Sequence, residues 1–236
     1  MTAVTEFLRS CDVHRLCHFT PSRNLPHIIR DAQIRATKDL SEDVRAVYAA
    51  TDLARLDGFP DRVCCTIEYP NAYYWAKAKE QGEARLFPDW VVLLIDPEVA
   101  AQPGTFFCTG NASRLSGATA RPGLEGLQGL YAASVEGSRG RTFTRCASHL
   151  QACPTDLQAE LLMPAPIEFA AVQAIVVETD DQAATEVARL AQASLPIDSV
   201  TWVVAPTFFR PYQLAPALQS GRRPNETQWT REEPSQ

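Results

Sequence analysis

The 236-residue chain contains no uninterrupted apolar run of about 18 residues, the length that a membrane-spanning helix requires. Its first residues, MTAVTEFLRSCDVHR, also reach polar side chains too early to form the apolar core of a signal peptide. We therefore expect a cytoplasmic protein without a membrane partner. The sequence shows no internal repeat, and its length favours a single domain with one sizeable core.

The seven cysteines include no pair separated by two residues, which is the spacing typical of zinc ribbons and redox motifs. Their number is odd, and Cys64 and Cys65 are adjacent, so a disulfide framework is not indicated. We interpret them as reduced, mostly buried thiols and expect no metal site. A thiol hydrolase that uses Cys64 or Cys65 with a histidine is an alternative, but no partner motif accompanies these residues.

The chain also lacks an excess of positive charge, since 22 lysines and arginines face 28 acidic residues and the net charge is -6. This balance disfavours tight nonspecific binding to polyanions. Positive charge is nevertheless concentrated locally, because the stretch from 114 to 145 has two acids, Glu125 and Glu136, against five arginines. These are Arg114, Arg121, Arg139, Arg141 and Arg145. A nucleic-acid substrate is therefore permitted by the composition without being required by it.

No glycine-rich loop follows a strand with Rossmann or Walker spacing, so a bound dinucleotide must be held by another fold. Hydrophobic periodicity predicts strands at 16–20, 62–69, 90–95, 104–108, 157–163, 172–178 and 200–205. Helices are expected after Ser22, Ser41 and Asn71 and near 181–193. This order, with early alternation and later strands, favours an α+β domain over a doubly wound parallel sheet.

Two segments lack a sustained apolar period. Residues 110–141 carry seven glycines and are expected to form a long functional loop, which continues toward residue 156. The end of the chain from about 218, QSGRRPNETQWTREEPSQ, is polar and contains proline. We therefore predict a folded domain over 1–217 and a flexible tail over 218–236.

Gln158 and Glu160 lie two residues apart in DLQAELLMP, within a predicted strand. Side chains two apart on a strand share a face, so the amide and the carboxylate are expected to stand together. A carboxylate placed in this way can bind a ribose hydroxyl and stabilise the cation that develops when a glycosidic bond breaks. An exposed strand edge also presents such side chains without any catalytic role, and spacing alone does not separate the two interpretations.

The motif CHFTPSRNLPHII, followed far downstream by QAELLMPAPI, resembles the DarT family of DNA ADP-ribosyltransferase toxins over roughly residues 14–205. The resemblance implies an ADP-ribosyltransferase-like fold with central split β-sheets flanked by short helices. It also implies NAD as co-substrate and Glu160 as the catalytic glutamate. His18, Phe19 and Thr20 would contact the nicotinamide and its ribose, and Asn24 would help to hold the dinucleotide.

In that family an arginine beside the scissile bond follows the amino-terminal motif. Arg55 is the best candidate here and Arg45 the alternative, while Arg55 or Gln158 would orient the acceptor. The segment before the glutamate shapes the nucleic-acid site, so that Arg114 and Arg145 would contact phosphates. Three successive aromatics at 73–75 cannot share one helix face, so at least one is expected in the core, and Tyr74 is a candidate for stacking on a base.

The resemblance implies a toxin that modifies a base of single-stranded DNA and has an antitoxin partner, an ADP-ribosyl hydrolase of macrodomain type or a guanine-branch counterpart. GFPDRVCCTIEYPNAYYW lacks the aromatic-rich strand of the thymidine-modifying members, so guanine is favoured over thymine. We expect a monomer. The alternatives are an ADP-ribosyltransferase that acts on RNA or protein, and a noncatalytic binding module.

Overall fold

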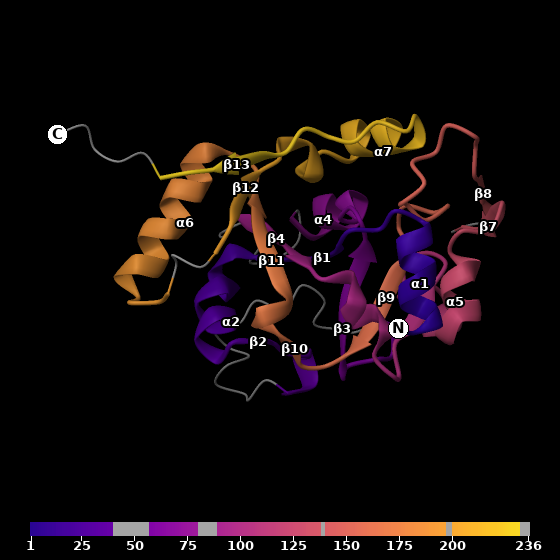
Figure 1. The fold of residues 1–236 in the computed structure, drawn as a ribbon, viewed down its shortest axis with the longest axis horizontal. Coiled ribbons are helices and arrows are strands. Elements are labelled where there is room, and N and C mark those ends of the chain that lie inside the picture. The colour runs from indigo at the N-terminus through magenta and orange to yellow at the C-terminus, as the bar shows by residue number, and fades with distance from the viewer. Residues whose placement is uncertain (40–56, 80–88, 138–139, 197–199, 232–236) are drawn as a thin grey trace.

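The computed structural model describes residues 1–39, 57–79, 89–137, 140–196 and 200–231. Within these residues the main β-sheet has nine strands in the order β13-β12-β11-β4-β1-β3-β9-β5-β6 (Figure 1). The strands are β1 (Leu16–Pro21), β3 (Arg62–Ile67), β4 (Trp90–Ile95), β5 (Phe106–Cys108), β6 (Arg121–Pro122), β9 (Glu160–Pro164), β11 (Val172–Val177), β12 (Trp202–Val204) and β13 (Thr227–Trp229).

Two small sheets and several helices complete the fold. The small sheets pair β2 (Gln33–Ile34) with β10 (Ile167–Glu168), and β7 (Ser134–Glu136) with β8 (Thr142–Thr144). The α-helices are α1 (Ala3–Ser10), α2 (Leu25–Asp31), α4 (Ala72–Lys79), α5 (Gly123–Gly129), α6 (Asp180–Gln192) and α7 (Pro211–Gln219). Helix α6 lies at one end of the molecule and α5 with β7 and β8 at the other (Figure 1). None of the helices in the described ranges combines the length and the apolar composition that crossing a membrane requires.

Both faces of the main sheet are covered, and strand β4 shows this most directly. Val91, Leu93 and Ile95 belong to the core cluster shared with α1, α2, α5 and α6. Trp90, Val92 and Leu94 belong to the cluster formed with α4 and α7 on the other face. Because successive side chains alternate between the faces, the run WVVLLI must be apolar throughout. The expected α+β class is therefore confirmed.

The sheet splits between β1 and β3. Strand β1 pairs with β4 along its whole length, whereas it pairs with β3 only through Leu16–Ile67 and Cys17–Thr66. From His18 onward the two strands diverge, and the His18 imidazole spans the opening to the Cys64 carbonyl oxygen at 2.9 Å. The expectation of a split central sheet thus corresponds to a fork inside one continuous nine-stranded sheet.

The glycine-rich stretch 110–141 is more structured than the sequence predicts, because it contains α5, β6 and β7. Helix α5 has three glycines, which weaken a helix, so its stability comes from packing of Leu127, which is fully buried. Gly126 lets the helix backbone approach the Arg121 backbone closely, since a Cβ at this position would lie 2.3 Å from the Arg121 carbonyl oxygen. The expected helix after Ser41 lies outside the described residues.

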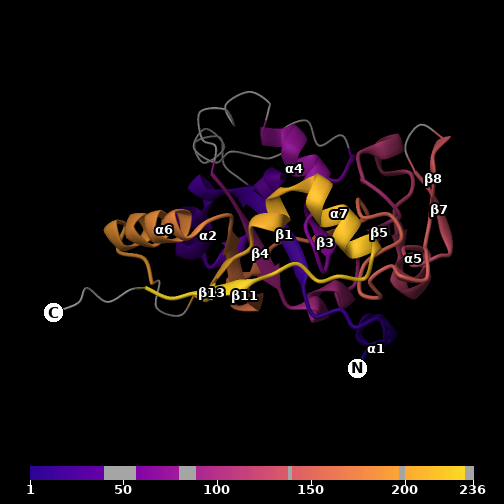
Figure 2. The ribbon, with the colours of Figure 1, turned by 90° about the horizontal axis from the view of Figure 1, so that it is seen from above.

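The segment after residue 218 also differs from the prediction of a flexible tail. It returns along the molecule from α7 and adds β13 to the edge of the sheet (Figure 2). Its charges are paired: both Arg15 guanidinium Nη atoms donate to Glu226 at 2.5 Å, and Arg223 donates to the buried carboxylate of Glu68 at 2.6 Å. A polar composition predicts flexibility, but in this segment the polar side chains form ion pairs that hold it against the domain.

Replacing Arg15 by methionine is expected to lower the free energy of unfolding by about 2 kcal/mol, because the Glu226 carboxylate then loses its partner in a largely buried setting. The two side chains are 12% and 23% exposed, and Arg15 also stacks on Tyr69. Denaturant titration measures the loss. The matched control is Arg9→Met, which breaks an exposed ion pair with Glu98 and should cost less than about 0.5 kcal/mol. Equal losses in the two variants would contradict the assignment.

Candidate active site

A cavity opens at the fork between β1 and β3, with an empty volume of about 860 Å³ including the space at its mouth. It is lined by Cys17, His18, Phe19, Thr20, Arg35, Thr37, Asp57, Arg62, Val63, Cys64, Cys65, Thr66, Tyr74, Asn111, Ser113 and Glu160. The structure therefore brings the predicted His18, Phe19, Thr20, Tyr74 and Glu160 together in one hollow.

Glu160 is the first residue of β9 and is only 5% exposed. Strand β5 ends at Cys108, directly opposite Glu160 in the register, so the residues that follow fold over the carboxylate. Its Oε1 accepts from the side-chain Nδ2 of Asn111 at 2.9 Å and from that of Asn71 at 3.5 Å. Its Oε2 accepts from the backbone N–H of Ala112 at 2.6 Å. A buried carboxylate is thus fixed by a set of donors from two loops.

Burial raises the pKa of Glu160 to about 7, because the charged form loses its hydration. The hydrogen bonds from Ala112, Asn71 and Cys64 oppose this rise, and the negative charge of Asp57 adds to it. The carboxylate is therefore ionised only near and above neutral pH. Such a group can stabilise a developing positive charge, or accept a proton, under ordinary cellular conditions.

The residues of β1 form the opposite wall of the cavity. A carbonyl oxygen can only accept, so Nδ1 of His18 carries the proton and donates it to the Cys64 carbonyl oxygen. Phe19 packs between Tyr74 and Trp90, with ring centroids 5.7 Å and 5.6 Å away. The Thr20 hydroxyl accepts from the Nδ2 of Asn24 at 2.8 Å. Asn24 is fully buried and orients Thr20 rather than lining the cavity itself.

Two arginines among the described residues of the cavity wall, Arg35 and Arg62, were not singled out by sequence reasoning. Arg35 directly follows β2 and lies 3.3 Å from the carboxylate of Asp31, the last residue of α2. Arg62 donates to the Gly104 carbonyl oxygen at 2.7 Å and lies over the Phe106 ring. Neither position belongs to a motif, so only the fold identifies them. The predicted Arg45 and Arg55 lie outside the described residues.

Gln158 does not share a strand face with Glu160, so that expectation is wrong. Strand β9 begins at Glu160, and Gln158 lies in the turn before it, where its backbone N–H donates to Asp156 Oδ1 at 2.9 Å. The aspartate side chain competes for the amide that a longer strand would use. Gln158 is also absent from the cavity lining.

The two arginines predicted to contact phosphates have different surroundings. Arg145 donates to the carbonyl oxygens of Cys153 at 2.7 Å and Gln151 at 3.0 Å, and it stacks on Tyr131. These contacts hold the Arg145 side chain against the segment that follows it, residues 150–153, and against Tyr131. Arg114 directly follows the lining residue Ser113, is half-buried and donates to the Glu136 carbonyl oxygen at 2.5 Å. Phosphate contact by Arg114 stays a prediction.

The aromatic residues of α4 point in three directions, as the helix period requires. Tyr74 lines the cavity, and its backbone N–H is capped by Asn71 Oδ1 at 3.1 Å. Trp75 is buried against Phe209, and Tyr73 is 40% exposed next to Tyr212. The expectation that at least one of them belongs to the core is confirmed.

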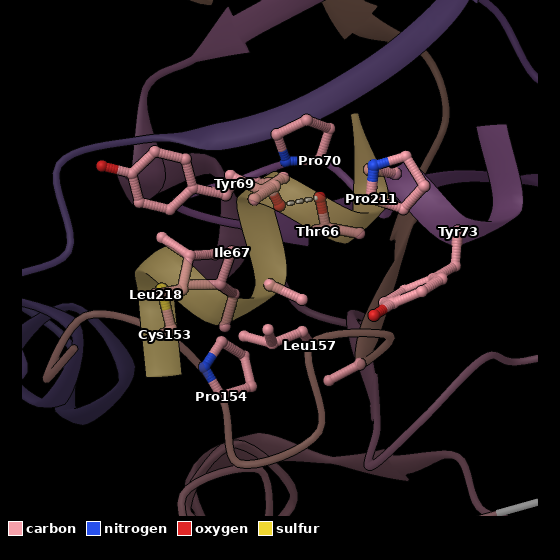
Figure 3. A pocket seen from close by; sticks show the side chains of 14 residues that line it. Thr66, Ile67, Tyr69, Pro70, Tyr73, Cys153, Pro154, Leu157, Pro211 and Leu218 are labelled. Atoms are coloured by element: carbon pink, nitrogen blue, oxygen red, sulfur yellow. Dashed lines mark hydrogen bonds between the residues drawn. The ribbon is translucent and has the colours of Figure 1, made fainter. Parts of the chain in front are cut away.

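A second, smaller pocket lies between α4 and α7 (Figure 3). Its described lining is apolar apart from groups such as Tyr69, Tyr73 and Thr66, and the Thr66 hydroxyl donates to the Tyr69 carbonyl oxygen at 2.7 Å. In contrast to the cavity at the fork, it has no charged side chain among the described residues that line it. The cavity at the fork is the candidate active site.

Cys65 and Cys108 are unsuited to act as nucleophilic thiolates. All seven cysteines are described and none is in a disulfide. Burial raises the pKa of Cys108 to about 12 and that of Cys65 further, so neither supplies a thiolate at neutral pH. Within the described part of the chain, no three His, Cys, Asp or Glu side chains are grouped as metal ligands would be.

Comparison with known proteins gives one family and several solved structures. The family model described as "DarT: ssDNA thymidine ADP-ribosyltransferase, DarT" matches residues 17–210. Thermus sp. 2.9 DarT in complex with NAD+ has a TM-score of 0.53 at 16% identity, covering 84% of this chain and 98% of that chain. The same protein with ADP-ribosylated ssDNA gives 0.51 at 14% identity, covering 84% and 97%. Thermosipho africanus DarTG with ADP-ribose gives 0.55 at 13%, covering 83% and 51%. No curated protein matches by sequence.

Proposed function

The chain belongs to the DarT family of single-stranded-DNA ADP-ribosyltransferases, and on that premise we propose that it transfers ADP-ribose from NAD to a base of single-stranded DNA. The observation that carries the proposal is Glu160, a buried carboxylate that accepts hydrogen bonds from Asn71, Asn111 and the Ala112 N–H and lines the cavity at the fork. A solved relative with the same fold is bound to NAD+, and a second form of it to ADP-ribosylated ssDNA.

In the proposed reaction, the bond between the anomeric carbon of the ribose and the nicotinamide nitrogen breaks, and its electron pair leaves with nicotinamide. Glu160 accepts a hydrogen bond from a ribose hydroxyl and stabilises the positive charge that develops on the sugar. The lone pair of a base nitrogen then forms the new bond to the anomeric carbon, and the base loses its proton. Products are the ADP-ribosylated base, nicotinamide and a proton.

The remaining cavity residues bind and orient the reactants. His18, Phe19 and Thr20 form the wall against which the nicotinamide and its ribose would lie, with Asn24 fixing the Thr20 hydroxyl. Arg35 and Arg62 would supply positive charge toward the pyrophosphate. Tyr74 at the wall and Arg114 beside it are suited to the acceptor base and its phosphate. Arg55, with Arg45 as the alternative, keeps its proposed place beside the scissile bond.

The preferred base is the finer part of the proposal. The stretch after Arg55 led us to favour guanine, whereas the description of the matching family names thymidine. The comparisons lend guanine no support, so thymine is the base to test first and guanine is the second. RNA and protein acceptors are further outcomes of the same assay.

The partner, the assembly and the location are also proposals. Thermosipho africanus DarTG, a structural neighbour, supports an antitoxin partner for this chain, and we propose that the partner is an ADP-ribosyl hydrolase. We further propose that the protein acts as a monomer in the cytoplasm, where single-stranded DNA is accessible during replication.

Mass spectrometry after incubation with NAD tests the proposed activity. Single-stranded oligonucleotides that each lack one base, a matched RNA and a protein extract serve as acceptors. We expect one ADP-ribose added to DNA and lost when thymine is omitted; loss on omission of guanine would reinstate the guanine assignment. Modification of RNA or protein alone would replace DNA as the acceptor, and no adduct with any acceptor would favour a binding module.

Substituting His18 by alanine is expected to raise the KM for NAD about tenfold. The variant loses part of the cavity wall together with the hydrogen bond between His18 Nδ1 and the Cys64 carbonyl oxygen. His18 spans the fork to Cys64, so its removal also widens the opening. The control is His27→Ala on α2, a residue outside the cavity lining. Steady-state kinetics with varied NAD measure both, and an unchanged KM for the His18 variant would remove it from the NAD site.

A further inference from the structure

The segment after β5 forms a tight turn that points one amide at Glu160. Asn111 Oδ1 accepts from the backbone N–H of Ser113 at 3.1 Å and also from the Ser113 hydroxyl. Because Oδ1 is occupied by these donors, the other end of the amide, Nδ2, must face Glu160, which it reaches at 2.9 Å. The orientation of the Asn111 amide is therefore fixed by hydrogen bonding on both of its ends.

The turn itself is anchored on both sides. A Cβ at Gly110 would lie 2.9 Å from Asp156 Oδ2, so the backbone approaches that buried carboxyl as closely as glycine allows. Ala112 is 1% exposed, and its carbonyl oxygen accepts from the Gly117 N–H at 3.0 Å. A donor held on such a rigid turn can hold its acceptor in one conformation.

We propose that Asn111 is a positioning residue for the transfer reaction: its anchored amide keeps the Glu160 carboxylate in one orientation and favours its charged form. The inference rests on the proposed function and deepens it. Glu160 has about four lone-pair positions, of which Asn111, Asn71 and the Ala112 N–H use three. The Cys64 thiol also donates to Glu160, and a thiol is a weak donor that a ribose hydroxyl can displace.

The hydrogen bonds from the Ala112 N–H and from Asn71 also favour the charged form of Glu160. Asn71 donates at the longer distance of 3.5 Å, and its side-chain oxygen caps α4. Charged or titratable groups that face the carboxylate are Asp57 before β3, Cys64 and Cys65 on β3, and Cys108 on β5, with His18, Arg35 and Arg62 lining the same cavity. Cys65 and Cys108 are neutral thiols at neutral pH, and Asp57 opposes ionisation of Glu160. Of the two side-chain amides that donate to Glu160, Asn111 is the closer, at 2.9 Å against 3.5 Å for Asn71.

The first test is the variant Asn111→Ser. A serine oxygen can still accept from the Ser113 N–H and keep the turn, but it is too short to reach Glu160. Loss of a hydrogen bond to the charged form should move the acidic limb of the kcat/KM profile upward by about one pH unit. The control is Asn225→Ser, the same substitution at an exposed asparagine, which should leave the profile in place. An acidic limb at the wild-type pH in Asn111→Ser overturns the proposal.

The second measurement does not depend on activity. Carbon-13 NMR of labelled glutamate carboxyls follows the Glu160 titration in the free protein, with Glu160→Gln assigning the signal. Asn111→Asp keeps the acceptor for Ser113 and puts a second carboxyl beside Glu160, so it should raise the titration midpoint further than Asn111→Ser. If both variants titrate like the wild type, the proposal fails. A shifted midpoint in a protein without transferase activity would instead overturn the proposed function alone.

Discussion

Replacing Glu160 by glutamine is expected to lower the rate of ADP-ribose transfer about a thousand-fold, while the affinity for NAD changes much less. The carboxylate stabilises charge that exists only in the transition state, and removing one such preorganised group costs on the order of a hundred- to a thousand-fold in rate. Glutamine has nearly the same shape but no charge. Single-turnover mass spectrometry of the DNA adduct, together with NAD titration by calorimetry, measures the two quantities separately.

The matched control for this experiment is Glu98→Gln, which makes the same chemical change at an exposed carboxylate outside the cavity. Circular dichroism and thermal unfolding of both variants separate loss of chemistry from loss of fold. A Glu160→Gln variant that retains near-wild-type transfer would show that the carboxylate is not catalytic. Equal loss in both variants would point to the fold instead.

The rate of transfer is expected to fall about tenfold for each pH unit below neutrality, so that at pH 5 it is about a hundred-fold lower than at pH 7. This follows because burial raises the pKa of Glu160 to about 7, so the charged form that stabilises the transition state disappears as the pH falls. The pH dependence of kcat/KM reports this group in the free enzyme. A profile that is flat between pH 5 and 7.5 would contradict the assignment.

The same carboxyl links stability to pH with the opposite sense. A folded-state pKa above the unfolded value means that the folded protein binds the proton more tightly. This contribution to stability is fully present below pH 4.5 and is lost as the pH rises to about 7, a change of roughly 3 kcal/mol. Denaturant titrations at several pH values should show this decline in the wild type, and Glu160→Gln should lack it. Activity and stability therefore change in opposite directions between pH 5 and 7.

The sequence predicts well those elements whose pattern is local. The apolar strand at 90–95, the strand that contains His18 and the Asn71 cap of α4 are all found where periodicity and capping place them. Glu160 was also identified from its motif, and the structure brings it to the cavity with His18 and Thr20.

The partners of Glu160 could not be predicted in the same way. Asn111 is 49 residues away along the chain, and its contact arises from the pairing of β5 with β9. The error at Gln158 has a local origin, because the Asp156 side chain accepts from the Gln158 N–H and the strand begins only at Glu160. At the carboxyl end, the composition indicates flexibility because it does not reveal which charges are paired. In the fold, Glu226 pairs with Arg15, and Arg223 pairs with Glu68.

The join between β1 and β3 determines how the two walls of the cavity are held. Within the described strands, the backbone pairs that link the two halves of the sheet are Leu16–Ile67 and Cys17–Thr66, and His18 adds a side-chain hydrogen bond to the Cys64 carbonyl oxygen. Beyond these links the walls belong to different halves of the sheet, with His18 on β1 and Glu160 on β9. The width of the cleft is therefore set by a few links at its base, and no continuous backbone ladder crosses it in the described strands.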